Sequence, residues 1–150
     1  MNDPEGQSRR ARKDAQRYED EQIFLRELGR ALQMELEERR LRRMEDHPPE
    51  VPLPPGEASL ERVWRRELEI IAGAEAAISS EPLEQVLRQW LRRIQRRAME
   101  LAAQPRAHAS YSPEYWQCET DRLVLTDLLR RWWEWQGGPQ KTGKDAGWGR

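Results

Sequence analysis

The feature that most constrains the fold is a cluster of five prolines in ten residues, HPPEVPLPPG at positions 47–56. Proline fixes φ and lacks a backbone N–H, so this density blocks a helix and favours extended polyproline II geometry. We interpret residues 47–57 as a semi-rigid linker that separates two parts of the chain. The alternative interpretation is a docking motif for an aromatic groove, which proline-rich segments also fit.

The part before the linker has the pattern of one long amphipathic helix. From about Ser8 to Asp46 proline is absent, and apolar residues recur at three- and four-residue steps. The main apolar stripe consists of Tyr18, Leu25, Leu28, Leu32 and Leu36. A second apolar set, on the opposite side, consists of Ile23, Met34, Leu41 and Met44. Two apolar edges on one helix suggest two partners, whereas the polar residues 1–8 are expected to fray.

The part after the linker has the pattern of three helices. The first is expected to begin at Ser59 as its N-cap. The second and third are expected to open at Ser80-Glu81-Pro82 and Ser112-Pro113-Glu114, where a hydroxyl residue is followed by proline and an acid. The third is expected to stop at Gly137-Gly138-Pro139.

No segment alternates like a β-strand, so the fold class is predicted to be all-α. The predicted layout is a long N-terminal amphipathic helix over residues 1–46, a proline-rich hinge, and a C-terminal three-helix bundle over 58–136. Residues 137–150 are glycine-rich and polar and are expected to be disordered.

Residue patterns that support catalysis or metal binding are missing from the sequence. The two histidines, His47 and His108, have no ligand pair at helical spacing, and Cys118 is better explained as a buried structural residue. No nucleophile elbow or phosphate-binding loop occurs. Many glutamates precede an arginine by four residues, as in Glu35–Arg39, Glu38–Arg42, Glu61–Arg65 and Glu84–Arg88. We therefore expect neither enzymatic activity nor a metal or other cofactor.

The location of the protein is expected to be intracellular. A single cysteine indicates a reducing compartment or indifference to redox, and no apolar run is long enough for a membrane span. In a eukaryotic host the location could be cytoplasmic or nuclear, and RRARK at 9–13 fits a localisation signal.

Charge is distributed in blocks although the net charge is only −1. On the long helix, a basic block at 9–17 precedes an acidic stretch at 19–38, and a second basic block follows at 39–43. Antiparallel self-pairing is one interpretation, since basic ends would meet acidic middles; contact with phosphates or an acidic partner is the other. For the second interpretation the candidate residues are Arg39, Arg40, Arg42 and Arg43.

A more informative interval lies in the second helix of the predicted bundle. No acid occurs between Glu84 and Glu100, whereas five arginines do: Arg88, Arg92, Arg93, Arg96 and Arg97. Like charges at four-residue spacing lower helix stability, so such a face needs another explanation. It suits an RNA or single-stranded DNA backbone, although a solvated face or one docked on an acidic helix would also explain it.

Seven tryptophans occur in 150 residues, and we predict an interface at Trp133 and Trp135, with Trp64, Trp90 and Trp132 in the core. Two hypotheses follow from the whole sequence. The first is a small non-enzymatic adaptor or regulatory protein that self-associates through Leu25, Leu28, Leu32 and Leu36 and contacts nucleic acid through its arginines. The second is a pure protein–protein module, in which the long helix is a coiled-coil scaffold and the tryptophan patch docks another protein.

Overall fold

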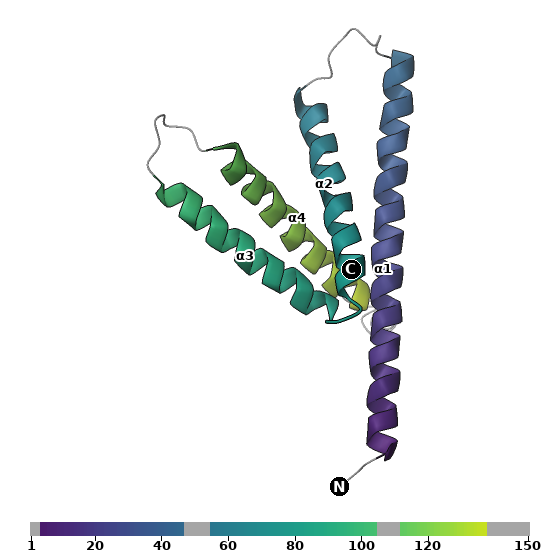
Figure 1. Ribbon diagram of the computed structural model, residues 1–150. Helices are drawn as coiled ribbons and strands as arrows, with labels where there is room; N and C mark the ends of the chain where they lie inside the picture. Colours follow the sequence, from purple (N-terminus) through teal and green to yellow (C-terminus); the bar gives the residue numbers. More distant parts are fainter. Residues whose placement is uncertain (1–3, 47–54, 105–111, 138–150) are drawn as a thin grey trace, which may run out of the picture. The chain divides into compact units, whose positions relative to one another are not determined.

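The computed structural model describes residues 4–46, 55–104 and 112–137, and it confirms the all-α fold class. The described residues form four helices and no strand (Figure 1). Their bounds are Pro4–Asp46 for α1, Pro55–Ala77 for α2, Leu83–Ala103 for α3 and Pro113–Gln136 for α4. The predictions made for His47, His108 and the tail beyond Gly137 fall outside the described residues.

The chain divides into two compact units, Met1–Leu83 with α1 and α2, and Glu84–Arg150 with α3 and α4. This grouping differs from the predicted one, which placed α2 with the two later helices. The reason is that α2 packs against the apolar stripe of α1, as described next. Whether residues 58–136 fold as a domain by themselves stays a prediction.

In the first unit, α1 and α2 lie side by side as an antiparallel hairpin (Figure 1). Gly29 marks their contact: a Cβ added there would lie 3.7 Å from Ile71 Cγ2 and 4.0 Å from Leu68 Cδ2. With 43 residues against 23, α1 extends well beyond α2, and residues 7–16 are exposed throughout. Helix α2 therefore covers one face of α1 over part of its length, and the rest of the α1 surface faces solvent.

Three helix starts differ from the sequence prediction. Helix α3 begins at Leu83, so Ser80, Glu81 and Pro82 precede the helix instead of forming its cap and first turn. The other two starts lie earlier than predicted. Helix α1 begins at Pro4, in the segment expected to fray, and α2 begins at Pro55 instead of after Ser59. Both starts place proline at the first helical position, where its missing N–H costs nothing because that group has no partner within the helix. The proline-rich segment therefore contributes its last residues to α2.

In the second unit, α3 and α4 form another antiparallel hairpin around a small apolar cluster. Ala98, Leu101 and Cys118 are buried there, and Ile94 and Tyr115 pack against them. Burial raises the pKa of the Cys118 thiol, in agreement with a structural role for this residue.

The ends of α4 agree with the sequence prediction. Ser112 is the N-cap, and its hydroxyl accepts a 3.2 Å hydrogen bond from the Tyr115 N–H. The helix ends before Gly137, whose N–H donates back to the Trp133 carbonyl. The buried face holds Leu125, Leu128 and Trp132, as the apolar stripe predicts.

Candidate nucleic-acid interface

The arginine face of α3 is open to solvent. Its helix buries Val86, Leu87, Ala98 and Leu101 on one side. The opposite side carries Arg88, Arg92 and Arg96, whereas Arg93 and Arg97 border the buried side next to Val86. All five predicted arginines are exposed. At 3.6 residues per turn, Arg88, Arg92 and Arg96 form a row along the helix. The five side chains selected from the sequence are thus exposed in the structure, and their contact with nucleic acid stays a prediction.

Three of these arginines, Arg92, Arg93 and Arg96, have no ion pair with any other residue in the part of the chain that the structure describes. For Arg92 and Arg93 the cause is local sequence, because neither has an acid at the three- or four-residue spacing that pairs arginines elsewhere. Arg96 has Glu100 four residues on, but the Glu100 carboxylate lies 3.4 Å from Arg97 instead. We call Arg92, Arg93 and Arg96 the open arginines. They are the cations of this face that remain available to an external anion.

The other two arginines of the face are held by carboxylates of their own unit. Arg97 of α3 donates to Glu114 at the start of α4 with distances of 2.8 and 3.0 Å, and its Nη1 lies 3.4 Å from Glu100. These hydrogen bonds, the one with Glu114 above all, raise the pKa of Arg97 further. Arg97 therefore joins the two helices of its unit.

Arg88 belongs to a compact group with Glu84 and Trp133. Its Nε lies 3.5 Å from the Glu84 carboxylate, and its guanidinium carbon lies 5.4 Å from the centre of the Trp133 ring. The indole N–H of Trp133 donates to the same carboxylate. Trp133 remains 49% exposed, so it lies at the surface beside the arginine row, but the charge of Arg88 is already matched by Glu84.

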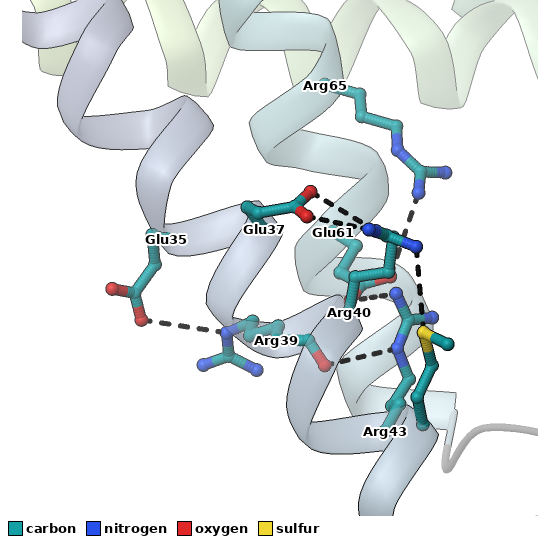
Figure 2. Close-up of polar contacts among 8 residues, drawn as sticks. Glu35, Glu37, Arg39, Arg40, Arg43, Glu61 and Arg65 are labelled. Atoms are coloured by element: carbon teal, nitrogen blue, oxygen red, sulfur yellow. Dashed lines mark hydrogen bonds and ion pairs between the residues drawn. The ribbon is translucent and has the colours of Figure 1, made fainter.

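The second predicted basic set, on α1, is matched to glutamates throughout. Arg39 lies 3.8 Å from Glu35, and Arg40 forms two hydrogen bonds with Glu37, at 2.7 and 3.2 Å (Figure 2). Arg42 likewise lies 3.8 Å from Glu38. The Glu35–Arg39 and Glu38–Arg42 pairs confirm the four-residue pairing predicted from the sequence. The basic block at 39–43 therefore presents far less unpaired positive charge than four arginines in five residues would indicate.

The last member of that set, Arg43, connects α1 with α2. Its Nη2 lies 3.1 Å from Glu61, whose carboxylate also lies 4.0 Å from Arg65 (Figure 2). Glu61 is only 4% exposed, so this ion pair belongs to the interior of the hairpin. Nearby, the Arg39 guanidinium carbon lies 4.7 Å from the centre of the Trp64 ring. Arg39 and Arg43 therefore serve the packing of the first unit.

The apolar stripe predicted for self-association lies on the side of α1 that faces α2. Leu25 is fully buried, and its three companions, Leu28, Leu32 and Leu36, are half-buried. In this conformation Leu25 offers no surface to a second chain. The opposite apolar set is the exposed one: Ile23, Met34, Leu41 and Met44.

The predicted tryptophan patch is only partly present. Trp135 is half-buried and stacks on the buried Trp132, with ring centres 5.5 Å apart. Trp64 and Trp90, predicted for the core, are half-buried. The more exposed apolar residues of α4 are Trp116 and Leu123, which lie seven residues apart on its outer side. Leu123 was missed because the sequence prediction looked for an interface among the tryptophans alone; its seven-residue spacing from Trp116 is the signal that could have found it.

Two findings concern other classes of site. Among the residues that the structure describes, no group of three or more histidine, cysteine or acidic side chains is placed to hold a metal ion. Within the same residues, no helix is both long and apolar enough to cross a membrane.

Comparison with known proteins finds no family model, curated protein or solved structure that matches this chain.

Proposed function

We propose that the protein is a non-enzymatic helical adaptor that contacts the backbone of RNA or single-stranded DNA through α3. The observation that carries the proposal is the set of open arginines, Arg92, Arg93 and Arg96, which are exposed and unpaired among the described residues. Self-association, which the sequence also predicts, is the second part of the proposal and is developed below.

The chemistry of this face favours phosphate as the ligand. A guanidinium presents paired N–H donors that match two phosphate oxygens, and its charge does not titrate near neutral pH. The glutamines Gln85 and Gln89 lie on the same side of α3 and add hydrogen-bonding amides. Trp133, at the edge of the row, offers an exposed aromatic surface of the kind that stacks on unpaired bases.

The binding test is a salt series with a fluorescently labelled single-stranded RNA, measured by anisotropy on the full chain. If three phosphates are neutralised, the logarithm of the binding constant should fall against the logarithm of salt with a slope of about −2 to −3. Arg92→Glu combined with Arg96→Glu should weaken binding and make the slope shallower by the amount expected for the loss of about two phosphate contacts.

The matched control is Arg40→Glu combined with Arg42→Glu, which makes the same change in net charge on α1. Since both α1 arginines already have glutamate partners, this variant should keep the wild-type slope. Equal loss of binding in both variants would show that only net charge matters. No saturable binding by the wild type at about 0.15 M salt, where specific binding is normally retained, would contradict the proposal.

A second candidate function is docking of another protein on α4. The observation in its favour is the exposed pair Trp116 and Leu123, since exposed tryptophan is a frequent anchor of protein interfaces. In this case Trp116→Ala should abolish partner binding while the arginine variants leave it unchanged.

A further inference from the structure

The outer face of α1 combines exposed apolar residues with charges that have no partner. Ile23, Met34 and Leu41 fall within about 20° of one another around the helix, on the side away from α2. Met34 is 62% exposed and Leu41 49%. Between them lie Glu27 and Arg30, both exposed, and neither forms an ion pair with another described residue.

The missing pairs are notable because most of the neighbouring charges on α1 are matched. Arg39, Arg40, Arg42 and Arg43 all have glutamate partners. Glu27 and Arg30 are three residues apart, a spacing at which Arg40 and Glu37 do pair, yet they remain separate. The centre of the outer face thus carries one free negative and one free positive charge.

These residues follow the seven-residue repeat of a helix–helix seam. One position of the repeat is occupied by Asp20, Glu27, Met34 and Leu41, and the other seam position by Ile23, Arg30, Glu37 and Met44. This face is therefore patterned for a second helix, and α2, the other helix of the same unit, packs on the opposite side of α1.

We propose that the outer face of α1 pairs antiparallel with the same face of a second copy of this chain. The inference rests on the self-association in the proposed function and assigns it a surface and a register. When Glu27 lies opposite Arg30 of the second copy, the two-fold axis also places Arg30 opposite the Glu27 of that copy. The same register places Ile23 opposite Met34, and Leu41 opposite Gln16.

Other arrangements match this face less well. Parallel pairing brings Glu27 next to Glu27 and Arg30 next to Arg30, which is repulsive. A shift of one heptad in either direction places Met34 opposite Arg30, or Ile23 opposite Glu27, and so buries a charge against an apolar side chain at the centre of the face. The chosen register has such a contact only at the end of the face, where Met44 lies opposite Lys13. The chosen register also places Asp20 of one copy opposite Glu37 of the other, which is a contact between like charges. These carboxylates already accept hydrogen bonds from Gln16 and Arg40 of their own chain.

The experiment exchanges charges on the full chain and measures mass by sedimentation equilibrium at micromolar concentrations. In a dimer of the Glu27→Arg variant, arginine would face arginine at both symmetric sites. In a dimer of the Arg30→Glu variant, glutamate would face glutamate at both sites. Each single variant should raise the dissociation constant of the dimer by about tenfold or more. An equimolar mixture of the two variants should recover wild-type association, because every arginine then faces a glutamate.

Native mass spectrometry of the mixture should show the heterodimer in preference to either homodimer, and the double variant should dimerise like the wild type. Glu75→Arg, an equal charge change at an exposed position of α2, is the matched control and should leave the dimer unchanged. Far-UV circular dichroism checks that every variant keeps its helix content.

Two results would overturn the proposal, and they can be told apart. A wild-type chain that stays monomeric would exclude self-association altogether, and with it that part of the proposed function. A wild-type dimer that persists in both single variants, or a mixture that fails to recover association, would exclude this surface and register but leave self-association standing.

Discussion

The carboxylate of Glu21, in the middle of α1, accepts a 2.9 Å hydrogen bond from the backbone N–H of Leu83, the first residue of α3. Glu21 is only 1% exposed, and its nearest cation, Arg17, lies 3.9 Å away. A residue 62 positions earlier in the chain thus supplies the acceptor that the first N–H group of α3 requires. The contact fixes the end of the α2–α3 connection to α1.

Replacing Glu21 should therefore show two effects on stability, the loss of the hydrogen-bond acceptor at the start of α3 and the removal of a buried carboxyl group. Burial raises the pKa of this carboxyl, while the Leu83 N–H and Arg17 oppose the shift. An acid with a raised folded-state pKa binds more protons in the folded state, so its contribution to stability falls as pH rises above about 4.5. In Glu21→Gln this contribution is absent, so the stability of the variant relative to wild type should increase from pH 4 to pH 7.

Urea unfolding at several pH values measures the effect, and Glu21→Ala serves as the second variant. Alanine leaves the Leu83 N–H without an acceptor, at a cost of about 1–3 kcal/mol. A Glu21→Gln variant whose stability runs parallel to wild type over this range would show that the carboxyl titrates normally.

The two arginines Arg43 and Arg40 should differ in their importance to stability, although both pair with glutamates. Arg43→Ala leaves the buried Glu61 with only Arg65 at 4.0 Å, and we expect a loss of about 1–3 kcal/mol in the free energy of unfolding. Arg40→Ala removes an exposed pair with Glu37, which solvent screens, and should leave the free energy of unfolding nearly unchanged. Chemical unfolding of the two variants compares them directly, and similar losses would mean that Glu61 is better hydrated than its burial indicates.

Gly29→Ala should stabilise the first unit. Alanine is favoured over glycine inside a helix by about 0.5–1 kcal/mol, and the added methyl would meet Ile71 at an ordinary contact distance of 3.7 Å. Gly73→Ala, at an exposed position inside α2, should show the propensity gain alone. Thermal unfolding of both variants gives the comparison. A loss of stability in Gly29→Ala would mean that α1 and α2 pack more closely than the structure has them.

Much of the fold could be predicted because it depends on short-range chemistry. Helix α4 begins at Ser112 and Pro113 and ends at Gly137 because capping and φ preferences act within one turn. The Glu35–Arg39, Glu61–Arg65 and Glu84–Arg88 pairs follow from the pitch of the helix alone. The exposure of Arg92 and Arg96 was also predictable, since the same pitch places them opposite the buried side of α3. The exposure of Arg93 was not, because it lies seven residues after the buried Val86.

The tertiary structure decided everything that depends on which helices meet. It placed α2 on the leucine stripe of α1, which covers Leu25 and leaves the outer side, with Met34 and Leu41, exposed. It directed Arg43 to Glu61 and Arg97 to Glu114, and so removed these two arginines from the set available to an external anion. The periodicity of one helix determines which residues share a face, but the partner of that face depends on the apolar area and charge of every other helix in the chain.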